Sequence, residues 1–523
     1  MRPFFSRALG IGRGLWLLPL DFAFKTLGLR YGWLKALFDH APPLQLALAG
    51  RLRAERAAWR AVQEVPAYRS FAGAAGVDVM SLVPWGILRK LPETDKHSYV
   101  DRYPPAERCI EGRIPMTGTT IDESSGSTGR PYNWIRSQHE RAIAQRNISF
   151  FVRYCFGAEP LVTINAFSMG AWATGFNMSL ALNRNGIVKS TGPDVEKILD
   201  TLRFLGPRYR YLICGYPPFV KYLLDEGERA GIAWSDYRMH ALLGGEGMAE
   251  ELRDYLLLQF RSVFSGYGAT DIEIGMAGES PASVALRRVA RADPELHRAL
   301  FGESRLPMVF QYNPLIHHLE MNREGEVLCT ISRLDVLAPR IRYNVHDEGG
   351  ILDYGAVEQI LRRRGLHLDT LHEHPGAAGP RGPLPWTRPV HLPFLWIFGR
   401  RDATISVMGA NIYPEDIETL IYRDPPLARR IHSFGLLTIS GEDGTTRPGV
   451  ALELSEGVSV DQSWSERIAR QLSSGLAGLN LDYRTAAREF PGAMGLLVSV
   501  YPLGTGPFAA DVGRIKQRRI FQG

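Results

Sequence analysis

The chain has 523 residues, 45% of them hydrophobic and 22% charged, which are ordinary proportions for a globular protein. Lys and Arg number 61 and Asp and Glu 55, and the net charge of +6 is too small to indicate a dedicated nucleic-acid-binding protein. It suits an anionic small substrate or contact with an acidic membrane surface. At about 100–200 residues per domain, we expect three or four structural units.

The first 40 residues are basic and aromatic. Six Lys and Arg residues stand against two Asp residues, among short apolar stretches such as residues 15–18. Pro19 and Asp21 interrupt the apolar run, which falls short of the roughly 20 residues that a membrane-spanning helix needs. The pattern is typical either of a helix lying on a membrane surface or of an amphipathic helix packed on the main body, and both interpretations stay open.

The next part of the chain alternates between helical and strand-like patterns. A helix is predicted over residues 44–70, ending near Pro66. From about residue 120 to 280, apolar runs such as 161–167 alternate with helical segments such as 217–231. This alternation favours an α/β fold with a largely parallel sheet.

The last 200 residues change in character. Residues 308–353 are mostly strand-like, and the Pro- and Gly-rich residues 374–389 predict a loop or linker. Residues 399–523 predict a smaller α+β unit, with a helix near 461–478 and a late strand near 495–502.

The four cysteines are widely spaced and form no CxxC pair, which argues against a zinc finger or a redox motif. We therefore expect buried, reduced thiols in a cytoplasmic protein. The residues are Cys109, Cys155, Cys214 and Cys329.

The segment SSGSTGRP, residues 124–131, is the most informative motif. Its glycines let the backbone bend sharply, and its amides and hydroxyl groups could form a concave cradle for phosphate oxygens. It lacks the Walker A pattern, and taken alone it is more typical of a surface turn.

The segment SGYGATD, residues 265–271, follows a strand-like run. Tyr267 next to Gly268 offers a flat ring on which a base can stack, and Asp271 offers a carboxylate oxygen for a divalent cation. The alternative is that Thr270 or Asp271 caps a helix.

Two later segments carry further candidates. Asp347 ends the strand-like run RIRYNVHD, where a carboxylate can accept hydrogen bonds from a ribose diol or can simply begin a turn. Residues 398–418 combine a strand, a turn at Gly409 and a helix start at Pro414, and residues 399–402 are a natural hinge.

Together, these segments in this order resemble the adenylate-forming enzymes, in particular the phenylacetate–CoA ligase-like branch with its capsule-associated members. LPETDK at residues 91–96 and FSMGAWATGF at 167–176 resemble further segments of that branch. The resemblance covers roughly residues 50–523.

The resemblance implies an α/β fold with a large N-terminal adenylate-forming domain of mixed and parallel sheets and a small, mobile α+β C-terminal domain. We place the basic, aromatic extension at residues 1–45, the large ATP- and carboxylate-binding domain at 46–398 and the small domain at 399–523. The implied hinge is Asp402.

The resemblance also implies a role for each motif residue. Magnesium would be held by Asp271, and the acyl group would meet Phe167 and Trp172, which are equally consistent with core packing. The implied ATP-binding residues are Ser124, Ser125, Gly126, Ser127, Thr128, Gly129, Arg130, Gly245, Glu246, Tyr267, Gly268, Thr270, Asp347 and Arg400.

The sequence departs from the family pattern in several places. Asp271 stands where Glu is usual, Arg130 where the loop has Lys, and Met408 where the hinge segment has Arg. The catalytic lysine position falls on Arg514 in the most direct alignment, or on Lys516 after a two-residue shift, with Thr128 as a further catalytic residue.

The implied activity is ATP-dependent adenylation of a carboxylate, giving acyl-AMP and pyrophosphate, followed by acyl transfer to a thiol, most simply coenzyme A. ATP, Mg²⁺ and coenzyme A are the implied cofactors, and a small carboxylate is the substrate. The alternatives are another acceptor (an amine, a carrier-protein thiol or a sugar-linked group) or a degenerate nucleotide-binding protein without activity. A homodimer and peripheral membrane contact through residues 1–40 stay open.

Overall fold

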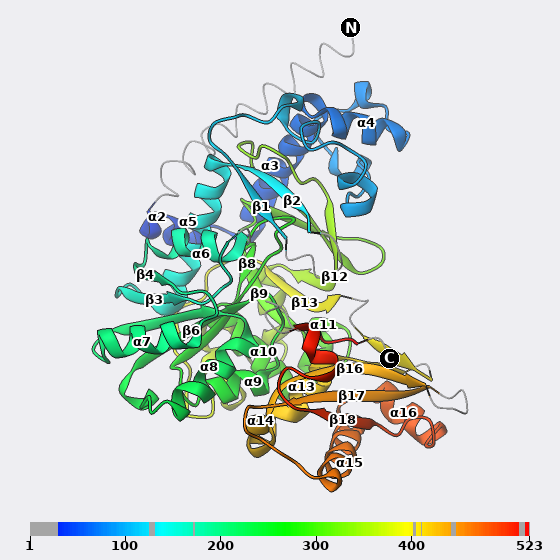
Figure 1. Ribbon diagram of the computed structural model, residues 1–523. Helices are drawn as coiled ribbons and strands as arrows, with labels where there is room; N and C mark the ends of the chain where they lie inside the picture. Colours follow the sequence, from blue (N-terminus) through cyan, green and yellow to red (C-terminus); the bar gives the residue numbers. More distant parts are fainter. Residues whose placement is uncertain are drawn as a thin grey trace. The chain divides into compact units, whose positions relative to one another are not determined.

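The computed structural model describes residues 30–124, 131–170, 173–400, 404–408, 410–440, 446–511 and 518–521 (Figure 1). They fall into two compact units. The first holds the described residues up to Gly192 together with Phe264–Ala378 and Pro383–Phe398. The second holds Pro193–Val263, Gly379–Gly382 and the described residues from Gly399 onward.

These units differ in part from the predicted domains. The last segment of the second unit begins at Gly399, where the sequence predicts the small domain to begin. The same unit also contains Pro193–Val263, which lies inside the predicted large domain. The domain limits at residues 45 and 398 stay predictions.

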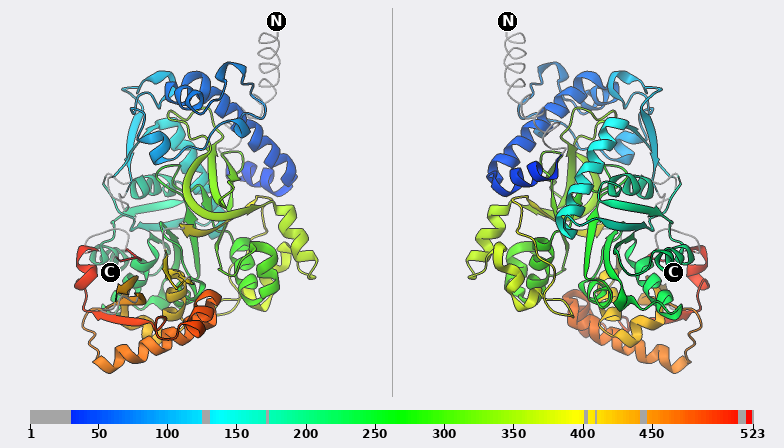
Figure 2. Two further views of the ribbon diagram at one scale, coloured as in Figure 1. Left: turned by 90° about the vertical axis from the view of Figure 1, so that its right-hand side faces the viewer. Right: turned by 90° about the vertical axis from the view of Figure 1, so that its left-hand side faces the viewer.

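Three helices begin the described part of the first unit: α2 (Tyr31–His40), α3 (Pro43–Glu64) and α4 (Pro66–Ala74). Proline starts α3 and α4, where its missing N–H and its fixed φ suit a helix start. The predicted helix over 44–70 is therefore two helices, because the residue before Pro66 is extended (φ −106°, ψ 112°). Helix α3 packs on strands β10 (His317–Met321) and β11 (Glu326–Ile331), as Figure 2 shows.

A hairpin and a parallel strand pair follow in the first unit. Strand β1 (Thr119–Glu123) pairs antiparallel with β2 (Asn133–Ser137), so the two strands flank the predicted phosphate loop. Helix α5 (Gln138–Phe156) follows, and α6 (Ala173–Leu182) joins the parallel strands β3 (Leu161–Asn165) and β4 (Gly186–Ser190). This part confirms the predicted alternation of strands and helices.

Antiparallel strands make up the rest of the first unit. Hydrogen-bonded neighbours follow the order β10-β11-β12-β13-β9-β8-β7. Helices that precede strand β9 in the chain and a helix that follows strand β12 bury apolar side chains in one cluster with Val309 and Phe394. The β-rich region predicted over 308–353 is confirmed. The remaining elements are β7 (Ser262–Tyr267), β8 (Ala277–Gly278), α10 (Pro281–Ala292), α11 (Pro294–Phe301), β9 (Met308–Tyr312), β12 (Tyr343–Leu352), α12 (Tyr354–Arg362) and β13 (Phe394–Arg400).

The second unit contains a parallel strand pair, β5 and β6, and the C-terminal α+β segment. In that segment β16 pairs antiparallel with β17, and β18 adds parallel to β17. The predicted helix start at Pro414, the helix near 461–478 and the late strand are all confirmed.

The elements of the second unit are α7 (Val195–Leu205), β5 (Arg210–Gly215), α8 (Pro217–Arg229), β6 (Arg238–Gly244), α9 (Glu250–Leu256), β14 (Ile405–Val407), β15 (Ala410–Ile412), α13 (Pro414–Tyr422), α14 (Pro425–Arg430), β16 (Ile431–Ser440), β17 (Thr446–Leu454), α15 (Gln462–Leu479), α16 (Leu481–Glu489) and β18 (Leu497–Tyr501). The fold class is therefore α/β, with both parallel and antiparallel strands.

All four cysteines are free and buried, as the sequence predicts. Burial raises the pKa of each thiol, to about 11 for Cys109. Within the described ranges, the helices are all too short or too polar to cross a membrane.

Gly50 marks a close approach between α3 and the segment before β10. A Cβ atom on Gly50 would lie 2.2 Å from the Pro314 carbonyl oxygen, whereas a Cβ atom on Gly73 of α4 would meet nothing within 4 Å. Gly50→Ala should lower the melting temperature, since overpacking of about 1–3 kcal/mol outweighs the gain in helix propensity of about 1 kcal/mol. Gly73→Ala is the control and should leave the melting temperature unchanged or raise it. Equal effects in calorimetry would contradict the close contact.

Candidate active site

The predicted phosphate loop is closed at its base by two hydrogen bonds. The Ser124 amide donates to the Tyr132 carbonyl oxygen, and the Tyr132 amide donates to Ser124 Oγ, each at 2.9 Å. Ser124 is buried at the end of β1, and Tyr132 precedes β2. The two strands thus fix the positions from which the loop departs, while residues 125–130 lie outside the described part of the chain.

The residues predicted to bind adenine and ribose lie in direct contact. Tyr267, the last residue of β7, donates its hydroxyl proton to Asp347 Oδ2 from β12. Its ring stacks on Phe310 of β9, with 5.5 Å between ring centroids. Burial first, and the Asp347 carboxylate second, raise the pKa of Tyr267 well above its usual value, so the hydroxyl stays a donor.

Asp271 lies in a second polar centre four residues after Tyr267. Its side chain is 8% exposed, and its Oδ2 accepts a hydrogen bond from the Tyr343 hydroxyl at 3.1 Å. Lys96 Nζ lies 3.0 Å from the same oxygen. No helix begins at Thr270 or Asp271, since the next helix, α10, starts at Pro281, so the helix-cap alternative is wrong.

Lys96 connects three of the sequence motifs. It ends the LPETDK segment and begins a short π-helix, Lys96–Val100, which is capped by Asp95 through Ser98. Besides its ion pair with Asp271, its ammonium group lies 5.3 Å from the ring centroid of Tyr132 at the base of the phosphate loop. A cation is therefore held between the loop and the predicted metal ligand.

Asp271 provides a single carboxylate for a metal ion. Among the described residues, no group of three or more His, Cys, Asp or Glu side chains is placed to hold a metal. A magnesium ion that arrives with a nucleotide uses one or two carboxylates, with phosphate oxygens and water as its other ligands. Asp271 fits such an ion and does not fit a structural metal centre.

Two arginines hold the backbone between Tyr267 and Asp271. Arg136 Nη2 donates to the Thr270 carbonyl oxygen and Arg340 Nε donates to the Asp271 carbonyl oxygen, each at 2.6 Å. Both guanidinium groups are buried. Hydrogen bonds from charged donors are about twice as strong as neutral ones, so these two fix the position of the motif.

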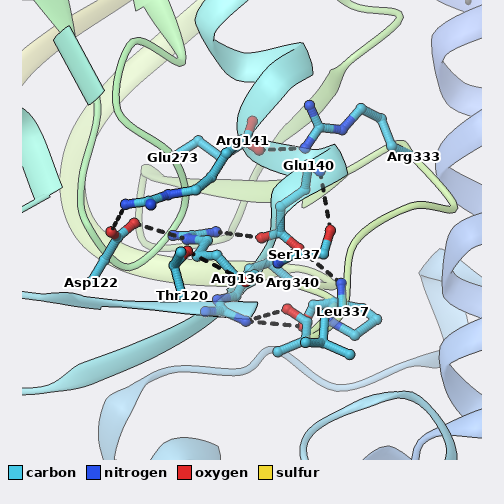
Figure 3. Close-up of polar contacts among 12 residues, drawn as sticks. Thr120, Asp122, Arg136, Ser137, Glu140, Arg141, Glu273, Arg333, Leu337 and Arg340 are labelled. Atoms are coloured by element: carbon cyan, nitrogen blue, oxygen red, sulfur yellow. Dashed lines mark hydrogen bonds and ion pairs between the residues drawn. The ribbon is translucent and has the colours of Figure 1, made fainter. Parts of the chain in front are cut away.

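A buried ion-pair network surrounds these arginines, and Figure 3 shows its members from β1, β2, α5 and the later segments. Arg136 Nε lies 3.6 Å from Asp122 Oδ2, and Arg136 Nη1 lies 3.4 Å from Glu140 Oε1. Asp122 also forms an ion pair with Arg141. Glu140 accepts further hydrogen bonds from the Ser137 and Leu337 amides. Burial raises the pKa of Glu140, and Arg136 partly offsets this.

Glu273 is a further buried carboxylate beside this network. It pairs with Arg333 and accepts a hydrogen bond from His317 Nε2 at 2.8 Å. Burial alone would raise its pKa, but Arg333 and His317 lower it from the usual 4.5 to about 2. Burial lowers the pKa of His317, so the imidazole is neutral and donates from Nε2.

Comparisons with known proteins concern the chain as a whole. No family model matches the chain. The chain is 24% identical over 405 residues to phenylacetate-coenzyme A ligase of Aromatoleum evansii, covering 74% of this chain and 79% of the relative. The chain is thus similar in sequence to a ligase of the branch that its motifs resemble.

Solved structures show the same fold. The TM-score is 0.66 to 2-hydroxyisobutyryl-CoA ligase in its postadenylation state with 2-HIB-AMP, at 13% identity over 93% of this chain and 92% of that one. It is 0.52 to the same ligase with 2-HIB-AMP and CoA in the thioesterification state, at 14% identity over 93% and 91%. The fold class expected from the sequence is thus that of adenylate-forming ligases.

Of the other residues predicted from the adenylate-forming pattern, some are described by the structure and the rest lie outside the described ranges. Phe167 is 2% exposed in the first unit, with its amide donating to Asn165 Oδ1. In the second unit, Gly245 follows β6 with φ +88°, Glu246 is half-buried, and Arg400 ends β13. Residues Ser125, Gly126, Ser127, Thr128, Gly129, Arg130, Trp172, Asp402, Arg514 and Lys516 lie outside the described ranges.

Sequence reasoning missed Lys96, Arg136 and Arg340 as site residues. Lys96 and Arg340 lie inside segments that resemble the family, but nothing in those segments shows that they reach Asp271. Arg136 lies next to the Ser137 cap of α5, where its local pattern is that of an ordinary strand residue.

Glu273→Gln should make the free energy of unfolding less dependent on pH in the acid range. The lowered pKa of Glu273 contributes about 3 kcal/mol above pH 4.5, and this contribution is lost as the pH falls towards 2. The variant should therefore melt well below the wild type at pH 7, and the difference should shrink as the pH falls below 4.5. Calorimetry from pH 7 to pH 3 measures this. Exposed Glu196→Gln is the control, and a constant difference for Glu273→Gln would contradict the assignment.

Proposed function

We propose that this chain is an AMP-forming acid–CoA ligase of the phenylacetate–CoA ligase-like branch. It activates a carboxylate with ATP, releases pyrophosphate and transfers the acyl group from acyl-AMP to the thiol of coenzyme A. The observation that carries the proposal is a pair of contacts made by one short motif. Tyr267 donates a hydrogen bond to Asp347, and Asp271, four positions further along the chain, forms an ion pair with Lys96.

The first pair supports nucleotide binding. The Tyr267 ring is fixed on one side by Phe310 and at its hydroxyl by Asp347, so it is held as a rigid flat surface for the adenine ring. An ionised carboxylate accepts several hydrogen bonds at once, so Asp347 can receive ribose hydroxyl protons as well as that of Tyr267.

The second pair supports phosphate binding. Attack of a carboxylate on the α-phosphate spreads negative charge over phosphate oxygens, which needs fixed positive charge rather than a proton donor. Lys96 supplies such a charge beside the base of the loop of residues 124–131. Mg²⁺, when bound with ATP, neutralises phosphate charge, and Asp271 is the residue that would hold it.

The remaining roles are proposed from the family pattern. Ser125, Ser127, Thr128 and Arg130 hold the β- and γ-phosphates, and either Lys516 or Arg514 takes the catalytic lysine position. The role needs a cation rather than a base, so an arginine can fill part of it. Between the half-reactions the C-terminal domain rotates about Asp402.

The N-terminal extension remains a proposed membrane-contacting segment. Of residues 1–40, the structure describes Arg30 onward, and α2 exposes Trp33 by 57% and Leu37 by 39% on successive turns. Exposed aromatic and aliphatic side chains among basic residues support contact with an anionic membrane surface. The alternatives of another acyl acceptor, a cytoplasmic protein without membrane contact and a homodimer stay open.

A panel of carboxylates scored by pyrophosphate release tests the ligase activity. We expect release that depends on both ATP and one class of acid, followed by thioester formation when coenzyme A is added. Asp271→Ala and Lys516→Ala should each slow pyrophosphate release by about 100-fold or more. Exposed Asp200→Ala and Lys189→Ala are the matched controls. If both site variants match the wild type, the catalytic assignment is wrong.

A second test addresses Lys96. Lys96→Met should lower the rate of adenylation by about 100-fold at saturating ATP, because the phosphate charge loses a fixed cation. Lys96→Arg keeps the charge and should recover part of that loss, while Lys90→Met, in the same stretch but exposed, should not change the rate. Equal rates for Lys96→Met and the wild type in single-turnover measurements would remove Lys96 from the mechanism.

A further inference from the structure

Strand β12 is irregular at the point where it carries Asp347. Its register with β11 shifts between Glu326 and Leu328, so that three residues of β12, 345–347, stand opposite Val327 alone. Extra residues of this kind form a β-bulge, which bends the strand and turns its side chains, and bulges are frequent next to active sites. The bulge therefore determines the direction of the Asp347 carboxylate.

The middle residue of this bulge, His346, has a strained backbone. Its φ is +64°, in the left-handed region that residues other than glycine adopt at a cost in free energy. A residue persists in such a conformation only where the surrounding structure holds it there. The contacts of His346 and its neighbours thus show what fixes the bulge.

Glu326 of β11 is at the centre of these contacts. Its Oε1 lies 3.3 Å from His346 Nδ1, and its Oε2 accepts hydrogen bonds from the side-chain amides of Asn344 at 2.6 Å and Asn322 at 2.9 Å. Asn344 Oδ1 in turn accepts a hydrogen bond from the His346 backbone amide at 2.7 Å. Burial would raise the pKa of Glu326, but the two asparagines and His346 together lower it, so the carboxylate is ionised.

The other nitrogen of the imidazole ring contacts a second motif. His346 Nε2 lies 3.4 Å from Asp95 Oδ2. Asp95 also accepts a hydrogen bond from the Ser98 amide at 2.6 Å and so caps the π-helix that begins at Lys96. His346 therefore joins the segment that carries Asp347 to the segment that carries Lys96.

We propose that Glu326 and His346 are positioning residues that hold the Asp347 carboxylate where it accepts hydrogen bonds from both ribose hydroxyl groups of ATP. The proposal rests on the proposed function, because it takes Asp347 as the ribose-binding residue. Glu326 holds the strained bulge from β11, and His346 ties it to Asp95. Hydrogen bonds weaken steeply as their geometry departs from the optimum, so a bulge that relaxes without these contacts costs affinity for the ribose.

The preference for ATP over 2′,3′-dideoxy-ATP measures this role, because the analogue lacks both hydroxyl groups. For the wild type with Mg²⁺, we expect calorimetry to give a Kd for ATP about tenfold or more below that for the analogue. Glu326→Ala should reduce this preference to about twofold or less, by weakening the binding of ATP and not that of the analogue. Glu324→Ala, which removes an exposed acid of the same turn, is the control and should keep the wild-type preference. An unchanged preference in Glu326→Ala overturns the proposal.

His346→Gly tests the second residue with little risk to folding, because glycine adopts a φ of +64° without strain. The variant removes the imidazole contacts with Glu326 and Asp95, so it should also reduce the preference for ATP. Glu326→Gln keeps the length of the side chain and one acceptor oxygen and should retain part of the preference. A merely structural role would lower the melting temperature of these variants and leave the preference unchanged, and that result overturns the proposal.

Kinetic measurements separate this proposal from the ligase proposal. Where pyrophosphate is released, Glu326→Ala should raise KM for ATP by about tenfold and change kcat little, because Lys96 and Asp271 remain in place. If no acid supports pyrophosphate release but Glu326→Ala loses the preference for ATP in calorimetry, the positioning proposal holds and the ligase proposal fails. If release is robust and the preference is unchanged in Glu326→Ala, the ligase proposal holds and the positioning proposal fails.

Discussion

Two guanidinium groups, those of Arg136 and Arg340, hold the carbonyl oxygens of Thr270 and Asp271, and much of the site depends on this contact. Each bond joins a charged donor to the backbone in a buried environment, where an unpaired charge would be costly. The arginines must therefore be compensated, and Asp122 and Glu140 do this for Arg136. The motif that carries Tyr267 and Asp271 is thus fixed through its backbone rather than through these two side chains, which are the ones proposed to contact ligands.

The charged groups that hold the backbone of this motif are different from the groups that its own side chains contact. The supporting charges come from β2 and from the segment that precedes β12, and they contact the backbone of the motif. The side chains of Tyr267 and Asp271 instead contact Asp347 and Lys96. A substitution in the supporting layer should therefore act on both the nucleotide side and the phosphate side, because it shifts the backbone that they share.

The sequence proposes some residues of this candidate site and misses others, and the reason is physical. Tyr267, Asp271 and Asp347 lie in short motifs whose local residue pattern is itself the signal. Arg136 and Arg340 act on residues 134 and 69 positions away, and such contacts leave no local pattern. The helix start at Pro414 was predicted because capping is local, whereas the predicted helix over 44–70 proved to be two, because Pro66 both ends one helix and begins the next.

The cysteines have a consequence for the proposed thioester-forming step. The thiolate is the reactive form of a thiol, and burial keeps all four cysteines protonated and away from solvent. An activated acyl group is an electrophile that any accessible thiolate would attack. Because none of the four cysteines is accessible, the acyl group of the proposed reaction would meet no internal thiolate, and the protein would avoid acylating itself before an external thiol binds.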